Sequence, residues 1–358
     1  MFAFPPLFLN GWKLADPSWC GTAIACMNTG SVYECVLISK WTTDLTGHHN
    51  LSHQRTIDRP VQCQGIGLHT GEKVTMTLRP SPANRGVIFR RVDLPDAPAI
   101  EARPEYVTNT QYATTIAKNG VSVKTIEHLM SALAAMGVDN VQVDLTGPEL
   151  PILDGSATPF VELLQQAGLR RQFAPKTFLK VRQPITVEMG TRSLRIVPSQ
   201  RLKVLYTMCF DHPILGEQTV AMEMGRERYI REVAPSRTYG FLKDLDMLSR
   251  MGLAKGGSLE NALVIGEDGV LNGPLRFPDE LVRHKILDLV GDLYLLGKPL
   301  VGTIIAHNAG HQLHLQLVQR IQEQLLADPE PFSLSVAPVE QWVSPLLPPA
   351  RGLKPAVL

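Results

Sequence analysis

One stretch decides the fold: residues 277–297 read FPDELVRHKILDLVGDLYLLG. Pro278 followed by two acidic residues is typical of a helix start, because proline needs no N–H in the first turn and carboxylates suit the positive end of the helix dipole. Gly297, followed by Lys298 and Pro299, predicts the helix end. Apolar residues at helical spacing predict one buried face. They are Ile286, Leu289, Val290 and Leu293.

A second edge of this helix carries His284, Asp288 and Asp292, one every fourth residue. A carboxylate is costly to bury unless it is paired or binds a metal, and a histidine one turn before an aspartate offers two ligands to one point. This pattern predicts half of a zinc site. An ion pair between His284 and Asp288 on the helix surface explains it equally well, so other parts of the chain must decide.

Composition limits the class of protein. The 358 residues allow one large or two ordinary domains, and 44% hydrophobic residues are enough for a core. With a net charge of +1, the chain lacks the excess of positive charge expected of a protein that binds nucleic acid or an acidic membrane surface. The five cysteines form no paired pattern, which favours a cytoplasmic location. No run approaches the ~20 apolar residues of a transmembrane helix.

The two ends of the chain differ in character from the part between them. Residues 1–51 begin with an apolar run that no basic residue precedes, so a signal peptide is not expected. We expect this segment to be an unstructured extension or the product of a misplaced start codon. Residues 327–358 form a proline-rich tail to which we assign no chemistry.

A second helix is expected over residues 126–136, with Thr125 as its N-cap and Gly137 as its stop. Glu127 and His128 then lie in the first turn, where the helix dipole favours an ionised glutamate and a neutral imidazole. A general base and a metal ligand require these forms. The alternative is a polar first turn that faces water.

The two halves of the chain, 52–174 and 175–326, repeat faintly. Each contains a strand that ends in Pro-Ser, and each contains a helix that ends in glycine shortly before a strand. Two similar domains would place the helices of His128 and His284 in related positions across their junction. Near the start of the first half, the glycine-rich turn at 65–71 contains His69, which we expect to be a structural or supporting histidine rather than a ligand.

Several longer motifs resemble those of a known enzyme family. From Arg55 to about Gln324 the chain resembles the UDP-3-O-acyl-N-acetylglucosamine deacetylases, zinc amidases that commit bacteria to lipid A synthesis. The matching motifs are GIGLHTG at 65–71, TIEHLMSA at 125–132, PILDGS at 151–156, SRTYGF at 236–241, GGS at 256–258, VRHKILD at 282–288 and GH at 310–311.

The resemblance implies that His128, His284 and Asp288 hold Zn²⁺, with a fourth position left for water. Three protein ligands and an open position are typical of a catalytic zinc. Glu127 would take the proton from water as general base. The implied reaction removes the N-acetyl group by hydrolysis and gives UDP-3-O-acyl-glucosamine and acetate.

Further roles follow from the same resemblance. His311 would stabilise the developing charge and protonate the departing amine, with Asp292 orienting it, and Thr238 would donate its hydroxyl to the oxyanion. Whether Glu127 moves the proton alone or shares this work with His311 stays open. Lys285 would reach the UDP phosphate.

The resemblance also assigns an acyl-chain tunnel to an insert at about 239–264, although the apolar pattern alone favours ordinary core there. Tyr239 occupies the place where the family commonly has phenylalanine against the sugar ring. The residues implied to contact substrate are Lys285, Tyr239, Phe241, Leu245, Ala254, Ser258, Ala262 and Val264.

The implied fold is α+β, with two similar domains that are each a layered β-sheet/α-helix sandwich and an active site at their junction. The implied partner is an acylated UDP-amino sugar, and we expect a monomer. The chain departs from the family in its first fifty residues and in Gln312-Leu313-His314 after His311, where the family more often has asparagine nearby. The alternatives are a zinc amidohydrolase for another N-acetylated nucleotide sugar, and a non-catalytic binding protein locked by zinc.

Overall fold

The structure is a computed structural model that describes residues 13–14, 23–28, 33–38, 52–327 and 332–335. Residues 1–50 and 51–358 form two separate compact units. In the first unit, an antiparallel sheet contains β1 (Lys13–Leu14), β2 (Ala23–Asn28) and β3 (Tyr33–Ile38). The rest of the 1–51 segment lies outside the described residues, so an unstructured extension or a misplaced start stays a prediction.

The second unit contains two five-stranded sheets. The first sheet has, in spatial order, β5 (Val61–Ile66), β6 (Lys73–Pro80), β12 (Val141–Leu145), β7 (Val87–Arg91) and β8 (Ala99–Glu101). In β6, buried and more exposed residues alternate, as the period of two in its sequence predicts. All neighbouring strands are antiparallel except β12 and β7, which are parallel.

The second sheet repeats this pattern. It contains, in spatial order, β15 (Ile185–Met189), β16 (Arg192–Val197), β23 (Thr303–His307), β17 (Lys203–Cys209) and β18 (Glu217–Glu223). Again only one neighbouring pair, β23 and β17, is parallel. β6 and β16, which carry the two Pro-Ser strand ends, hold equivalent places. The predicted repeat is therefore present in the strand order itself.

Small sheets complete each half. In the first half, β4 (His53–Ile57) pairs antiparallel with β13 (Leu169–Pro175). In the second, β14 (Phe178–Val181) pairs antiparallel with β24 (Phe332–Ser335) and parallel with β22 (Leu300–Val301). The expected boundary at 174/175 falls at the end of β13. Because residues 51–358 form one compact unit, a division into two domains stays a prediction.

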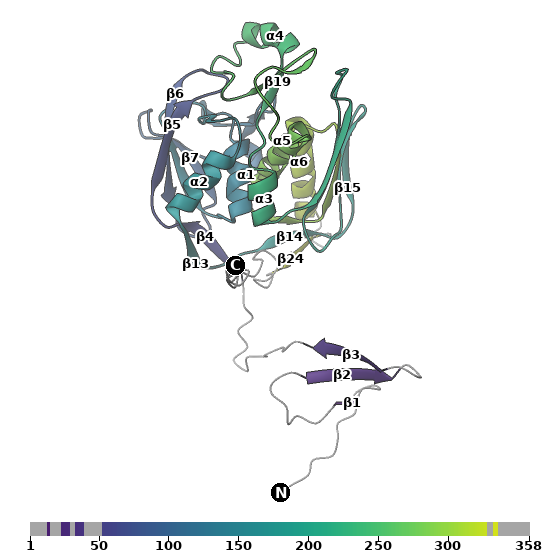
Figure 1. Cartoon of the computed structure of the whole chain (residues 1–358). Coiled ribbons are helices and arrows are strands. Elements are labelled where there is room, and N and C mark those ends of the chain that lie inside the picture. The colour runs from purple at the N-terminus through teal and green to yellow at the C-terminus, as the bar shows by residue number, and fades with distance from the viewer. Residues whose placement is uncertain (1–12, 15–22, 29–32, 39–51, 328–331, 336–358) are drawn as a thin grey trace, which may run out of the picture. The chain divides into compact units, whose positions relative to one another are not determined.

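Helices fill the space between the two large sheets, as Figure 1 shows. They are α1 (Glu127–Met136), α2 (Thr158–Ala167), α3 (Arg226–Glu232), α5 (Glu280–Leu293) and α6 (His311–Ala327). α1 precedes β12 and α5 precedes β23, so these two helices are equivalent in the repeat. The predicted α+β class, with two similar layered halves, is confirmed.

Each half also carries an insertion. The first contains a 3₁₀ turn, η1 (Pro104–Tyr106), and the strands β9 (Val107–Asn109), β10 (Thr115–Lys118) and β11 (Val121–Val123). The second contains β19 (Tyr239–Phe241), η2 (Leu242–Asp244), α4 (Leu245–Arg250), β20 (Leu263–Gly266) and β21 (Gly269–Val270). In Figure 1 the second insertion carries the labels α4 and β19 and lies at the upper end of the helix layer.

The helix boundaries agree with the sequence except at one cap. α5 continues through η3 (Tyr294–Leu296) and ends at Gly297 in the left-handed conformation, with a φ of 69°. α1 ends at Gly137, also left-handed. The expected N-cap role of Thr125 is wrong: Thr125 has a φ of 57°, and its hydroxyl donates to the Glu149 carboxylate over 2.7 Å instead of capping α1.

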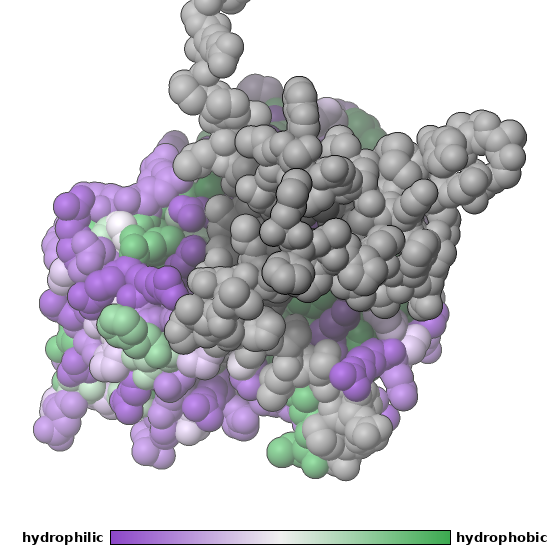
Figure 2. Space-filling view, turned by 90° about the horizontal axis from the view of Figure 1, so that it is seen from below, coloured by the Kyte–Doolittle hydropathy of each residue, from purple (hydrophilic) through white to green (hydrophobic). Residues whose placement is uncertain are grey.

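On the face seen from below in Figure 2, the visible described residues are mainly hydrophilic, and apolar side chains occur singly or in small groups. Among the described residues, no helix combines the length and the apolar character needed to cross a membrane.

Candidate active site

The candidate site lies where α1 and α5 cross. At the crossing, Gly291 of α5 contacts the backbone of Glu127 so closely that a Cβ at position 291 would overlap the Glu127 carbonyl oxygen. The close approach brings the first turn of α1, with Glu127 and His128, next to His284 and Asp288 of α5. Both helices are buried on the sides that carry these residues, so the polar groups are shielded from water.

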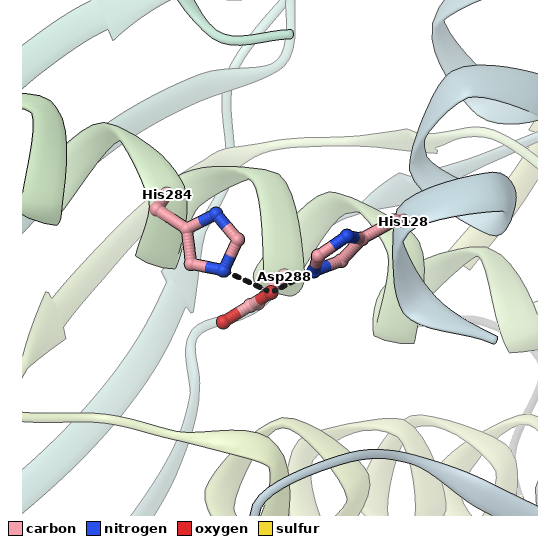
Figure 3. A group of neighbouring side chains, drawn as sticks. All are labelled: His128, His284 and Asp288. Carbon is pink, nitrogen blue, oxygen red and sulfur yellow. Dashed lines mark ion pairs between the residues drawn. The ribbon is translucent and has the colours of Figure 1, made fainter. Parts of the chain in front are cut away.

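His128, His284 and Asp288 converge on one point (Figure 3). Oδ1 of Asp288 lies 3.7 Å from Nε2 of His128 and 3.4 Å from Nε2 of His284. The ring centroids of the two histidines are 5.0 Å apart, and the rings are nearly perpendicular, at 84°. Residues from the two halves of the chain therefore present three ligand atoms within 4.8 Å of one another.

The unpartnered atoms at this point fit a metal ion. Oδ1 of Asp288 is buried and has no hydrogen-bond partner within the described part of the chain, which is costly for a carboxylate oxygen unless a cation meets it. Nδ1 of His284 lies 3.0 Å from the carbonyl oxygen of Ser236, which turns Nε2 toward Asp288. Burial and the neighbouring His284 lower the pKa of His128 to about 3, so its imidazole is neutral and can act as a ligand.

Glu127 lies directly beside this centre and is only 2% exposed. Its Oε2 accepts a hydrogen bond from the backbone N–H of Thr114 over 3.1 Å. Without a metal, burial raises the pKa of Glu127 to about 8. A carboxylate with such a proton affinity, next to metal ligands, is suited to accept a proton from water near neutral pH.

His311, the first residue of α6, faces the centre. Its Nε2 lies 3.8 Å from Oδ2 of Asp288, and its Nδ1 donates to Oδ2 of Asp292 over 2.7 Å. Burial alone would lower the pKa of His311, but Asp292 and Asp288 raise it to about 9. Burial would raise the pKa of Asp292, and His311 lowers it to about 2. The pair therefore keeps a proton on His311 that can be given to a leaving group.

Lys285 and Tyr239 lie beside the same centre. Lys285 donates to Oδ2 of Asp288 over 2.8 Å, and its ammonium lies 5.5 Å from the centroid of the Tyr239 ring. The Tyr239 ring lies 6.2 Å from the ring of His284. The Thr238 backbone is fixed, since its N–H donates to Gly155 over 2.8 Å. Thr238 is two residues after Ser236, whose carbonyl oxygen orients His284.

The insert residues are only partly brought together. Tyr239, Phe241 and Val264 lie on the paired strands β19 and β20, and the first two rings have centroids 6.2 Å apart. Ala262 is half-buried just before β20, whereas Leu245 and Ser258 are exposed. Because these residues are partly or fully exposed, they do not form a closed core. The assignment of an acyl tunnel to them stays a prediction.

The loop at 65–71 packs against the second insertion. His69 accepts a hydrogen bond at Nδ1 from the Ala254 N–H over 3.4 Å. The loop is held by Glu149, whose carboxylate accepts from the backbone N–H groups of His69 and Thr70. His69 is not one of the three converging ligands, and its supporting role stays a prediction.

Several residues of the site have no signal in the sequence. Thr114 lies in an ordinary polar segment, and Gly291 is one glycine within a helix. The carbonyl of Ser236 is a backbone group that no side-chain motif reveals. His314 was visible only as a departure from the family pattern. Contacts made by folding, rather than sequence spacing, bring these groups to the centre.

Comparison with known proteins gives a consistent result. Residues 54–323 match the family model described as LpxC, UDP-3-O-acyl N-acetylglycosamine deacetylase. A protein of Myxococcus xanthus named UDP-3-O-acyl-N-acetylglucosamine deacetylase is 46% identical over 283 residues, which are 79% of this chain and 89% of that protein. Proteins of the same name from Syntrophotalea carbinolica and Acidithiobacillus ferrooxidans are each 47% identical over 75% of this chain, and over 87% and 89% of their own lengths.

Proposed function

The chain belongs to the UDP-3-O-acyl N-acetylglycosamine deacetylase family, and on this premise we propose how its own residues carry out the reaction. The enzyme hydrolyses the N-acetyl group of UDP-3-O-acyl-N-acetylglucosamine, giving UDP-3-O-acyl-glucosamine and acetate, in lipid A biosynthesis. The observation that carries the proposal is the convergence of His128 from α1 with His284 and Asp288 from α5, directly beside Glu127.

The three converging residues would hold Zn²⁺. Two nitrogen donors and one carboxylate oxygen form a ligand set typical of catalytic zinc, which leaves a fourth position open. Two ligands that bind one tetrahedral ion at ~2.0–2.1 Å lie about 3.3 Å apart, close to the 3.4 and 3.7 Å between Asp288 Oδ1 and the two imidazoles. Zinc held there supplies Lewis-acid chemistry, which makes water nucleophilic near neutral pH and polarises an amide carbonyl.

Glu127 would act as the general base. Its carboxylate is held by the Thr114 N–H and lies in a buried setting that raises its proton affinity. In this position it can accept a proton from the attacking water and keep that proton within the site.

His311 would protonate the departing amine. Asp292 fixes its Nδ1, so Nε2 points toward the centre and carries the proton that the nitrogen of the sugar needs when the amide bond breaks. Thr238 would donate its hydroxyl to the oxyanion that develops on the acetyl oxygen.

Lys285 and Tyr239 would bind the nucleotide sugar. The Lys285 ammonium pairs with Asp288 and can exchange toward a phosphate, while the Tyr239 ring offers an apolar face close to His284. The 3-O-acyl chain would follow the partly exposed apolar residues of the second insertion, among them Phe241, Leu245 and Val264. Ala254, Ser258 and Ala262 complete this proposed acyl path.

The proposal also covers the partners, the oligomeric state and the location of the enzyme. The substrate is a small molecule, nucleic acid is not a partner, and the enzyme acts as a monomer in the cytoplasm. Cys63 and Cys209, the cysteines of the second unit, are both free, as expected of a reducing compartment.

The test is a metal analysis and a hydrolysis assay on the purified full chain. We expect about one zinc per chain and efficient turnover of UDP-3-O-acyl-N-acetylglucosamine, with far slower turnover of UDP-N-acetylglucosamine, because only the first carries the acyl chain. Equal turnover of both would support an amidohydrolase for another nucleotide sugar. Bound zinc without turnover of either would support a non-catalytic binding protein.

A further inference from the structure

The carboxylate of Asp292 is the centre of a buried hydrogen-bond cluster. Its Oδ1 accepts from the Thr114 hydroxyl over 2.6 Å. Its Oδ2 accepts from Nδ1 of His311 over 2.7 Å and from Nδ1 of His314 over 2.8 Å. Asp292 and Thr114 are each 2% exposed, and His314 is fully buried. Both oxygens are therefore held from opposite sides, and the carboxylate cannot rotate without breaking a bond to a buried donor.

Thr114 links the two acid–base groups of the site. The same residue donates its backbone N–H to Oε2 of Glu127 and its hydroxyl to Asp292, the residue that orients His311. Its hydroxyl oxygen also lies 3.3 Å from Nδ1 of His311. Thr114 comes from the first insertion, so one residue of the first half sets the relative positions of the Glu127 and His311 side chains.

His314 holds the other side of the cluster. It lies one turn after His311 on α6, and its Nε2 is 3.2 Å from the hydroxyl of Tyr206 on β17. Tyr206 in turn donates to the carbonyl oxygen of Ala309, in the loop that ends at His311. The cluster thus connects the second large sheet, the start of α6 and α5 through buried polar contacts.

Asp292, His311 and His314 lie close enough to hold a metal by distance alone. However, their N···O separations of 2.7 and 2.8 Å are those of hydrogen bonds. Two ligands that bind one tetrahedral ion at ~2.0 Å would lie about 3.3 Å apart. The shared oxygen and the short separations favour hydrogen bonding between these residues over a second metal site.

We propose that Thr114 and His314 are positioning residues, which clamp the Asp292 carboxylate so that Nε2 of His311 stays directed at the scissile amide. The inference rests on the proposed function of His311. Neither residue would touch substrate or the metal. Loss of either should therefore lower kcat and leave KM and metal content unchanged.

The main experiment compares Thr114→Val, Thr114→Ser and Thr115→Val in the full-length enzyme. Valine keeps the shape and the backbone N–H to Glu127 but removes the hydroxyl, so kcat should fall about 10-fold to 100-fold, the loss expected when a hydrogen bond to a charged group is removed. Serine keeps the hydroxyl and should restore most of kcat. Thr115 is the next buried threonine along the chain and serves as the matched control, with kcat unchanged.

A double variant tests whether Thr114 acts through Asp292. If it does, Thr114→Val combined with Asp292→Asn should be no slower than Asp292→Asn alone. Losses that multiply in the double variant, or a serine variant as impaired as the valine variant, would overturn the role assigned to Thr114. Wild-type kcat in Thr114→Val would do the same.

His314 is tested independently, so the inference survives if a Thr114 variant does not fold. Asparagine keeps an N–H donor near Asp292, whereas leucine removes it. We expect His314→Asn to retain more of kcat than His314→Leu, with KM and zinc content the same in both. Equal kcat in the two variants, or a loss confined to zinc content, would overturn the role of His314. Normal zinc content with no activity in the wild-type chain would instead refute the proposed function.

Discussion

Gly291 lies against the backbone carbonyl of Glu127, with no room for a side chain between them. The contact occurs where α5 crosses α1, between Asp288 and Asp292 on one helix and directly at the proposed base on the other. Because backbone atoms cannot move aside as a flexible side chain can, the separation of the two helices is set at this point. The position of His128 relative to His284 and Asp288 therefore depends on a residue that has no chemistry of its own.

Gly291→Ala should push the helices apart. We expect a loss of about 1–3 kcal/mol in the free energy of unfolding, the usual cost of overpacking a close contact, together with weaker metal binding. Urea unfolding and metal titration measure the two effects. Gly225→Ala is the control, since a Cβ at Gly225 meets no atom within 4 Å. An alanine variant with wild-type stability and metal affinity would show that the crossing can adjust.

Glu127 and His128 are neighbours with different expected functions. Glu127→Ala should keep stoichiometric zinc and lose about 10²-fold to 10⁴-fold in kcat, because only proton transfer is removed. His128→Ala should lose zinc as well as activity, since one of three ligands is gone. Elemental analysis of both variants beside the activity assay separates the two effects. Undiminished turnover in Glu127→Ala would remove this residue from the mechanism.

Glu280 should make stability depend on pH. Its carboxylate is fully buried and accepts hydrogen bonds from Arg237 and from the backbone N–H of Arg276. Burial by itself raises the pKa of Glu280, but the bonds to Arg237 outweigh it and hold the pKa below the usual value of 4.5. The ionised form is thus favoured in the folded state, and its contribution to stability is present above pH 4.5 and lost as pH falls through the lower folded pKa.

The matching measurement compares the wild type with Glu280→Gln by urea unfolding at several pH values. At pH 7 the variant should be less stable by about 1.5–3 kcal/mol, the range for hydrogen bonds to charged groups, and the difference should shrink in acid. Glu162→Gln, on the exposed face of α2, is the control. A difference that stays constant from neutral to acidic pH would contradict this account.

Removal of residues 1–50 should leave activity intact. All residues of the proposed site lie in the unit that begins at residue 51, and the matched family region begins at residue 54. We expect the shortened chain to have unchanged kcat and KM and to unfold cooperatively in circular dichroism. A product that is insoluble or inactive would show that the first unit contributes to the structure of the second.

Much of the fold could be predicted from local patterns. The alternation along β6, the apolar stripe of α5 and the glycine stops at Gly137 and Gly297 each depend on residues close in sequence, so periodicity and capping identify them. The N-cap at Thr125 was wrong because a distant residue, Glu149, competes for its hydroxyl. Local chemistry predicts a cap correctly only when no tertiary partner intervenes.

The sequence by itself determined the residue types of the site, since a histidine and an aspartate one turn apart and a Glu-His pair in a first helical turn are set by helical geometry and by the motifs that contain them. Only the tertiary structure decided that these groups meet. The two helices lie far apart along the chain, and their approach depends on packing at Gly291 and on buried donors such as Thr114 and His314. Contacts of this kind follow from the shape of the folded interior, which no short sequence pattern encodes.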